Sequence, residues 1–388
     1  NRPPVTERAF NDGYAGIRRV FSGIRGDFRY LSENAIFFAM NNEKEVREAF
    51  ASQAKWCDIL GSPLTASLVD GLGRKLDRHT KTGQIVLDWQ GPPDALGDSV
   101  PLRLAGALHA LVRRGQATDL ASVYPPNALP SAGILIDAAL AAIQDFDDEL
   151  VPWIQFAPQT NEVARSGALY PGMMQIAAQT GLPLAIHEVG ASAGLNMNMD
   201  RYAYLLGGHS TGDPESAVTL TPNWHGPAPS GSRPVVRSRR GCDRNPIDVS
   251  DDTQFERLIS FVWPDQDDRL ARITSACEIA QRHPLEIDRM DAADWVDKVF
   301  TAQPTEGVVR VLYHSIAFQY FPDDTKRRIH ECMNIAGDQA TADTPVAWLA
   351  YELQESGRPA LTLRLWPGHG EQVIAEGDAH CRDIKWMA

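Results

Sequence analysis

Short apolar runs alternate with helical patterns through the second half of the chain, and this alternation limits the possible folds most strongly. Amphipathic helical patterns at 254–262, 267–282 and 325–333 separate runs of strand length. Such alternation predicts an α/β fold, in which a mainly parallel sheet is covered by helices. The last runs have no helical pattern between them, which predicts antiparallel C-terminal strands. The predicted strands are 182–187, 234–243, 285–290, 308–313, 345–350, 360–365, 371–375 and 384–387.

The first 150 residues show few alternating β patterns and are predicted to be helical. Helices are expected at 43–60, 102–114 and 131–150, and Gly115 is suited to the left-handed cap of the second. A further helix, 171–180, precedes the first strand, and the proline- and glycine-rich segment 222–234 is predicted to be an inserted surface loop. We therefore expect an α-helical domain over 1–150 and an α/β domain over 151–388.

The charge balance narrows the classes of function. The 388 residues include 50 acidic and 37 basic side chains, for a formal net charge of -13. Binding to a phosphate backbone needs a basic surface, so we expect no nucleic-acid partner. Five scattered cysteines without a CxxC pair argue against a disulfide framework or a metal site, and they favour a reducing cytoplasm.

Targeting signals are equally sparse. No run reaches the roughly 18 apolar residues of a membrane span, so no membrane partner is expected. No signal peptide is visible, and the first residue is Asn1 rather than methionine, which leaves open a segment removed from the N-terminus. The sequence gives no indication of the oligomeric state.

The segment after the first predicted strand has the pattern of a cofactor-binding loop. Glu188, Gly190 and Gly194 form E-x-G-x-x-x-G between this strand and a helical segment. Glycines let the backbone turn tightly and approach a ligand, and a helix N-terminus offers free N–H groups. The pattern differs from the dinucleotide form GxGxxG because three residues separate the glycines. Tight packing of the turn is the alternative interpretation.

Residues 190–194 also spell G-x-S-x-G, the nucleophile elbow of α/β-hydrolases, with Ser192 as the nucleophile. A hydrolase would have several strands and a glycine-rich oxyanion loop before the elbow, whereas the preceding half is helical. A first strand near residue 184 favours a Rossmann-like sheet instead. Acids and histidines do follow downstream, so a serine hydrolase is the alternative enzyme.

Polar residues after the later strands extend the predicted site. Asp243 ends the second strand, where a carboxylate accepts hydrogen bonds from ribose, although it also suits a turn before Asn245. Asp291 and Ala292 follow the third strand. In methyltransferase-like folds this position lies against the adenine of the cofactor, although Asp291 also suits a helix N-cap. His314 follows the fourth strand at the ligand crevice and is predicted to be a general base, with a structural histidine as the alternative.

Two further polar groups are predicted on the substrate side. Gln159, Glu162 and Arg165 are spaced three residues apart, which places them on one helical face. They form either a solvated surface or part of the pocket. The segment Trp263-Pro-Asp-Gln266 precedes a helix and is predicted to be either a capped turn or a lid with an aromatic wall.

Together these motifs resemble a bacterial family known as domain of unknown function 2332. The resemblance covers nearly the whole chain and implies membership of that family, but no activity. The fold of the second half is in turn similar to that of class I S-adenosylmethionine-dependent methyltransferases, which is an analogy of fold. The motifs are Gln159 to Glu162, Glu188 to Asn196 with Asp200 to Tyr202, Gly241 to Asp248, Trp263 to Gln266, His314 to Tyr320 and Trp366 to Gly368.

The leading functional expectation is S-adenosylmethionine-dependent methyl transfer to a small molecule, which needs mainly proximity and alignment of the reactants. A non-catalytic nucleoside-binding protein is the alternative outside the enzymes. The predicted catalytic residue is His314. The predicted cofactor-binding residues are Glu188, Gly190, Ala191, Ser192, Ala193, Gly194, Asn196, Asp243, Asp291 and Ala292. The substrate-side candidates are Gln159, Asn161, Glu162, Arg165, Tyr202, Trp263, Asp265, Gln266 and Gln319.

Overall fold

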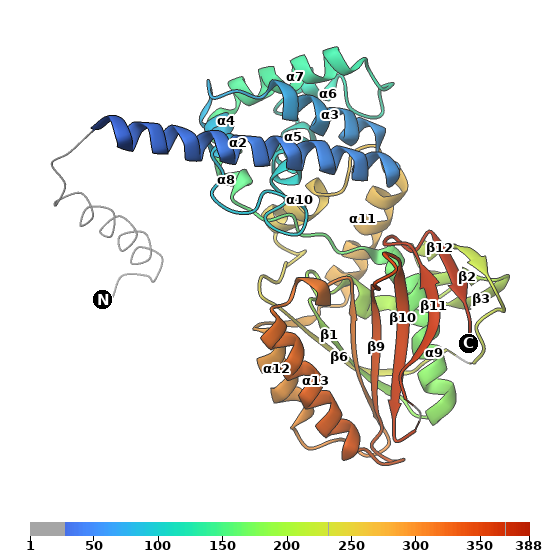
Figure 1. Cartoon of the computed structure of the whole chain (residues 1–388). Helices are drawn as coiled ribbons and strands as arrows, with labels where there is room; N and C mark the ends of the chain where they lie inside the picture. Colours follow the sequence, from blue (N-terminus) through green and yellow to red (C-terminus); the bar gives the residue numbers. More distant parts are fainter. Residues whose placement is uncertain (1–27, 232, 369) are drawn as a thin grey trace, which may run out of the picture.

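Packed helices form the N-terminal half of the structure (Figure 1). The computed structural model describes residues 28–231, 233–368 and 370–388, with side chains from residue 42 onward. The apolar faces of these helices meet in a core formed by residues between 46 and 154, in which α5 is buried along most of its length. The helices are α2 (Phe28–Ile59), α3 (Pro63–Lys75), α4 (Lys81–Leu87), α5 (Val100–Arg113), α6 (Thr118–Ala121), α7 (Ala132–Asp145) and α8 (Asp147–Ile154).

The helix predicted over 131–150 is divided at Phe146 into α7 and α8. Acidic side chains are favoured in a first helical turn, and α8 begins with a run of them. The carboxylate of Asp147 also accepts hydrogen bonds from the backbone N–H groups of Lys81 and Thr82, at 2.8 and 2.7 Å. The break therefore places an acid where it caps the start of α4.

One mixed sheet of nine described strands forms the C-terminal half, in the order β5-β12-β11-β10-β9-β8-β1-β6-β7. The strands from β7 to β9 are parallel, whereas β9, β10, β11 and β12 pair in antiparallel fashion. The predicted α/β fold, with a mainly parallel sheet and antiparallel C-terminal strands, is confirmed. The strands are β1 (Leu184–Val189), β5 (Asn223–His225), β6 (Val236–Asp243), β7 (Glu286–Arg289), β8 (Val309–Ser315), β9 (Val346–Leu353), β10 (Pro359–Trp366), β11 (Gln372–Gly377) and β12 (Asp383–Trp386).

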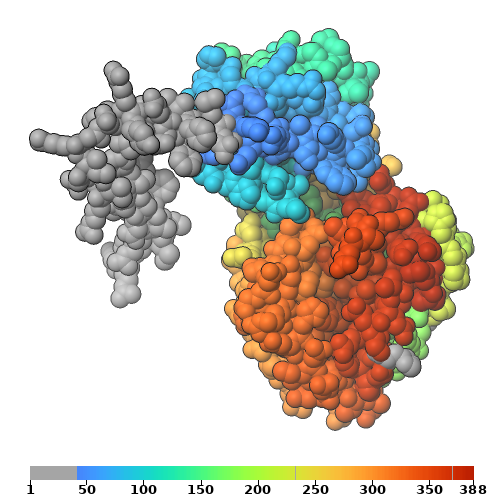
Figure 2. Space-filling model, viewed as in Figure 1, coloured from blue at the N-terminus to red at the C-terminus, as the bar shows by residue number. Residues whose placement is uncertain are grey.

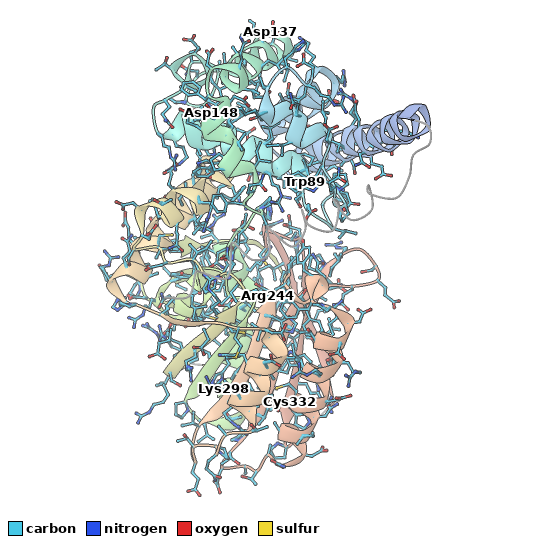
Figure 3. All side chains as sticks on the ribbon, turned by 90° about the vertical axis from the view of Figure 1, so that its left-hand side faces the viewer. Trp89, Asp137, Asp148, Arg244, Lys298 and Cys332 are labelled. Atoms are coloured by element: carbon cyan, nitrogen blue, oxygen red, sulfur yellow. The ribbon has the colours of Figure 1, made fainter. Side chains whose placement is uncertain are left out.

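The parallel strands fix where a ligand crevice belongs. Their order β7-β6-β1-β8-β9 is the 3-2-1-4-5 order of Rossmann folds, and it reverses between β1 and β8. In open α/β sheets, ligands bind outside the carboxyl ends of the strands at such a reversal. This edge faces the helical half: Arg244, which follows β6, lies near the helices, whereas Lys298 lies toward the far end of the sheet (Figure 3).

Helices cover both faces of the sheet. α12 (Ala292–Phe300) and α13 (Asp323–Asp338) lie on one face, and α9 (Ser166–Thr180) lies on the other (Figure 1). Successive side chains of a strand point to opposite faces, so Leu312 of β8 joins the core under α12 and α13, whereas Val311 and Tyr313 join the core under α9. The helix predicted to begin at residue 171 begins at Ser166 instead. Tertiary packing stabilises the extra turn before Pro171, because its residues are buried.

The segment between β1 and β6 contains elements that no pattern predicted. η2 (Leu195–Arg201) leads into a small sheet of β2 (Ala203–Leu206), β3 (His209–Gly212) and β4 (Thr219–Leu220). The segment 222–234, predicted to be a surface loop, includes β5, which pairs with β12 at the edge of the main sheet. The rings of Trp224 and Trp386 stack at 5.7 Å and hold it there.

α10 (Asp252–Ser260) and α11 (Asp267–Arg282) lie at the junction of the two halves, where the molecule narrows to a waist (Figures 1 and 2). α10 packs against α5, and Arg113 forms an ion pair with Glu256 at 2.7 Å. None of the described helices is long and apolar enough to cross a membrane. The described residues also include no group of three or more metal-ligating side chains suited to an ion.

Candidate functional site

A cavity of about 900 Å³ lies between the helical half and the carboxyl edge of the sheet. Its size is that of a pocket for a small molecule, and it lies beside the reversal of strand order, where Ile316 follows β8. We call it the junction cavity. It is lined by side chains within 53–68, 95–109 and 124 of the helical half, and within 158–165, 260–269, 316–320, 353–359 and 377–380 of the other half.

The walls of the junction cavity are mainly apolar. Leu68 and Leu102 line it from the helices, and Ile316 and Leu353 line it from the sheet. Trp56 also lines it and is 53% exposed, so the apolar surface continues to the mouth of the cavity. Binding of an apolar ligand to such a wall is favourable, because it removes apolar surface from water.

Positive charge gathers at the sheet end of the junction cavity. Glu162 is buried and forms an ion pair with Arg269 at 2.7 Å, and Arg272 lies 3.7 Å from its other oxygen. Burial alone would raise the pKa of Glu162, but Arg269, His380, Arg272 and Arg165 lower it to about 2. Three guanidinium groups therefore act on the carboxylate of Glu162. The other carboxylate at this end, that of Asp378, forms an ion pair with Arg382 at 3.5 Å, so the group keeps an excess of positive charge.

Of the three arginines, Arg165 has the positive charge that is most available to a ligand. Its guanidinium donates hydrogen bonds to the backbone carbonyls of Ser315, at 2.9 Å, and Ala379, at 3.1 Å. Within the described chain, no carboxylate lies within ion-pair distance of it. Carbonyl oxygens fix the side chain without neutralising it, so Arg165 lines the cavity as a positioned cation.

His380 lines the junction cavity beside this group. Its ring lies edge-on to Trp263, at 6.4 Å between centroids. Burial and the neighbouring guanidinium of Arg269 lower the pKa of His380 to about 4, although Glu162 acts in the opposite direction. The imidazole is therefore neutral near pH 7 and adds no charge to the site.

The predicted cofactor loop is packed by protein side chains. Gly190 and Gly194 both have φ +69°, as the turn requires. A Cβ on Gly190 would lie 2.6 Å from the Cβ of Ala317, and one on Gly194 would lie 2.6 Å from the Cε of Met197. The glycines thus permit close packing of the turn, which was the alternative interpretation. Ala191, Ser192 and Ala193 are buried as well, and none of the loop residues lines the junction cavity.

Asp243 closes this loop from the end of β6. Its Oδ2 accepts a hydrogen bond from the backbone N–H of Ser192 at 2.8 Å, and its Oδ1 accepts one from the N–H of Asn245 at 2.8 Å. Gln159 also donates to Oδ1, at 3.4 Å. The carboxylate therefore has the turn role predicted as the alternative, and each of its oxygens already accepts a hydrogen bond from the protein.

Glu188 is fully enclosed at the end of β1. Its side chain is 2% exposed, and the hydroxyl of Tyr313 donates to its Oε2 at 3.1 Å. Burial raises the pKa of Glu188 to about 8, and the charge of Asp243 acts in the same direction. A neutral carboxyl in the core beside a strand reversal is unusual, but it does not reach the junction cavity.

Ser192 lacks the surroundings of a nucleophile. It has φ 55°, and its hydroxyl is buried without a hydrogen-bond partner in the described chain. An activated serine needs a positioned base within hydrogen-bond reach. Asp291 likewise has a structural role, because its carboxylate caps α12 by accepting from the N–H of Ala293 at 2.9 Å, while Ala292 is buried.

His314, the predicted general base, is buried in a hydrogen-bond network at the end of β8. Its Nδ1 contacts Oε1 of Glu352 at 2.7 Å, and the indole N–H of Trp348 donates to its Nε2 at 3.0 Å. An indole only donates, so Nε2 accepts and the proton lies on Nδ1. Glu352 Oε1 also accepts from the N–H groups of Ala317 and Phe318. Neither ring nitrogen is left for a substrate, and His314 holds β8, β9 and the following turn together.

The substrate-side candidates separate into two groups. Gln159, Glu162 and Arg165 do not share a helical face, because the chain is irregular before η1 (Val163–Arg165). Asn161 accepts from the N–H of Leu195 at 2.8 Å. Tyr202 belongs to the same group, and its hydroxyl donates to the carbonyl of Leu195. Asn196, which was predicted to bind the cofactor, accepts a hydrogen bond from the hydroxyl of Ser166 in the same region.

The second group lies at the junction. Three of the substrate-side candidates, Trp263, Arg165 and Gln319, line the cavity. Asp265 instead accepts hydrogen bonds from Ser62 and from the N–H of Leu64 at 2.9 Å, which caps α3. Gln266 donates to the carbonyl of Leu60 at 3.1 Å. The Trp263 to Gln266 segment is thus a capped turn with an aromatic wall, and its polar side chains fasten the two halves together.

Several lining residues had no signal in the sequence. His380 follows β11 in a turn, and Arg269 lies in the first turn of α11, without a motif around either. His109 lies on α5 and contacts the carbonyl of Ser260 at 3.1 Å, a contact 151 positions away along the chain.

Comparison with known proteins places the chain in one family. A model of the family described as "Uncharacterized protein conserved in bacteria (DUF2332)" matches residues 47–386. The protein therefore belongs to this family, as its motifs predicted. No curated protein and no solved structure matches the chain. The family description names no reaction, so it supports neither methyl transfer nor hydrolysis.

Proposed function

We propose that this protein binds a small amphipathic organic anion in the junction cavity. The observation that carries the proposal is a positioned cation, Arg165, in the wall of a mainly apolar cavity of about 900 Å³. An unneutralised charge beside apolar surface is costly unless an opposite charge pairs with it. A ligand with an anionic group at Arg165 and an apolar body along Leu68 and Leu102 satisfies both features.

The charge balance at the sheet end specifies an anion. Glu162 is already shared between Arg269 and Arg272, and its low pKa of about 2 keeps it ionised at any ordinary pH. His380 is neutral near pH 7 because burial lowers its pKa to about 4. The group therefore keeps its excess positive charge. A carboxylate pairs well with a guanidinium because it accepts two parallel hydrogen bonds.

Calorimetric titration with dodecanoate, dodecanol and dodecyltrimethylammonium tests this proposal on the full chain. The three share one tail and differ in the charge of the head, and we expect the order anion, alcohol, cation. Arg165→Gln should weaken dodecanoate binding by tenfold to a hundredfold, since a hydrogen bond to a charged group contributes about 1.5–3 kcal/mol. Arg165→Lys, which keeps the charge, should lose less.

The control is Arg237→Gln, which removes an exposed arginine of β6 outside the cavity. Equal binding of all three heads, or an Arg237→Gln loss as large as that of Arg165→Gln, would refute the proposal. A thermal melt of each variant establishes that it is folded, because Arg165 also holds two backbone carbonyls.

S-adenosylmethionine-dependent methyl transfer, which was predicted from the sequence, is not part of this proposal. The strand order and the acid-glycine loop after β1 support it. The residues expected to hold the cofactor do not fit it as they are arranged, because Ala317 and Met197 fill the space beside Gly190 and Gly194. Asp243 is also engaged by the loop itself. We therefore derive no step that uses this cofactor.

A further inference from the structure

We infer that the helix-side end of the junction cavity is a second subsite, which recognises an uncharged hydrogen-bonding group at the far end of the ligand. This inference rests on the proposed function and specifies its ligand: an organic anion whose apolar body ends in a hydroxyl or carbonyl group. The subsite consists of Gln53 of α2, Thr65 of α3, Tyr124 after α6 and His109 of α5, all of which line the cavity.

Three of these side chains are unusual because their polar atoms are buried without a partner. Within the described chain, Oε1 of Gln53, Oγ1 of Thr65 and the hydroxyl of Tyr124 make no hydrogen bond, and their side chains are 6%, 1% and 1% exposed. Most buried polar groups in proteins are hydrogen-bonded, and an unsatisfied one is costly. Three such atoms from three separate elements, all along one cavity, indicate that the missing partner is a ligand.

The chemistry of the four side chains specifies a neutral group. Tyr124 and Thr65 carry hydroxyls that donate and accept, whereas the free atom of Gln53 is a carbonyl oxygen that only accepts. Burial lowers the pKa of His109 to about 4, so the imidazole is uncharged near pH 7. A hydroxyl both donates and accepts, and therefore suits this mixed set best.

The neighbouring charge sets the orientation of the ligand. Burial raises the pKa of the Tyr124 hydroxyl, and the negative charge of Asp265 acts in the same direction. The carboxylate of Asp265 is committed to Ser62 and the N–H of Leu64 at the start of α3. An anionic group at the helix-side end would meet this negative charge. The anion consequently belongs at Arg165, and the neutral polar group belongs beside Tyr124.

A matched pair of ligands tests the second subsite. Fatty acids of increasing chain length and their ω-hydroxy counterparts are titrated into the full chain by calorimetry. At the chain length that spans the cavity, we expect the ω-hydroxy acid to bind about 2- to 10-fold tighter, as for one net neutral hydrogen bond. In Tyr124→Phe this ratio should fall to about 1, whereas Tyr320→Phe, at the exposed mouth, should retain it.

The outcomes separate the two proposals. If neither acid binds, both the anion site and the second subsite are refuted. If the fatty acids bind through Arg165 but no ω-hydroxy acid gains affinity, only the second subsite is refuted. The ligand-free protein offers an independent check, because Tyr124→Phe removes an unpartnered hydroxyl and should not lower the melting temperature. A clear drop would mean that the hydroxyl already has a partner, and would overturn the inference.

Discussion

Replacement of Glu188 by glutamine measures how much a buried carboxyl at the strand reversal costs the fold. The pKa of Glu188 is raised from 4.5 to about 8, first by burial and further by the charge of Asp243, although the hydroxyl of Tyr313 acts against this. The folded protein thus keeps a proton that the unfolded chain releases. The contribution of Glu188 to stability is greatest below pH 4.5 and declines up to about pH 8, by about 1.4 kcal/mol for each pH unit.

Urea unfolding of the wild type and of Glu188→Gln across this range provides the assay. Other titrating groups are common to both proteins, so they cancel in the difference. We expect the wild type to lose about 2.7 kcal/mol relative to the variant between about pH 5.5 and pH 7.5. Glu306→Gln, at an exposed glutamate, is the control and should show no such trend. A pH-independent difference for Glu188→Gln would refute the assignment of a neutral carboxyl.

Three further predictions concern the surroundings of the site. Asp265→Ala should destabilise the protein by about 1–2 kcal/mol in urea unfolding, because α3 loses its cap. Glu352→Gln should lower the free energy of unfolding by about 1.5–3 kcal/mol near neutral pH. The hydrogen bond to His314 holds the pKa of Glu352 below its usual value although burial opposes this, so the loss should shrink as the pH falls through that pKa. A loss that does not change with pH would contradict this. Millimolar S-adenosylmethionine should leave the melting temperature unchanged, and Ser192 should not react with a fluorophosphonate; a shift would support the methyltransferase prediction, and labelling would support the hydrolase.

The centre of the main sheet could be predicted because its strands β1, β8 and β9 are largely buried on both faces. β8 and β9 are almost continuous apolar runs, and such runs are visible without any partner. β3, by contrast, consists of His209 to Gly212, with no apolar alternation. Its pairing depends on β2 across a short turn, so a local pattern could not reveal it. The break between α7 and α8 at Phe146 was not predicted, because the sequence on both sides is helical. Only the long-range hydrogen bond between Asp147 and α4 marks the position of the break.

Neighbouring residues in the sequence predicted the helix caps and turns better than the residues that line the junction cavity. Asp291 and Asp243 have the turn and cap roles that their immediate neighbours suggest. Arg165, by comparison, is held by the carbonyls of Ser315 and Ala379, which are 150 and 214 positions away. The unpartnered hydroxyl of Tyr124 is a property of the folded chain alone. A site assembled from such distant segments leaves no spacing in the sequence.

The junction cavity depends on both halves of the molecule. This explains why Asp265 and Gln266, next to Trp263, form hydrogen bonds that join the two halves. The sheet edge alone would present Arg165 and Ile316 to open solvent, where water screens an ion pair and leaves it little net energy. α2, α3 and α5 close over that edge and are held there by Asp265 and Gln266. The enclosure strengthens the attraction of Arg165 for an anion, because the local dielectric is lower than in water. In the proposed complex, the anion is therefore held by the sheet half, whereas the helices select among ligands.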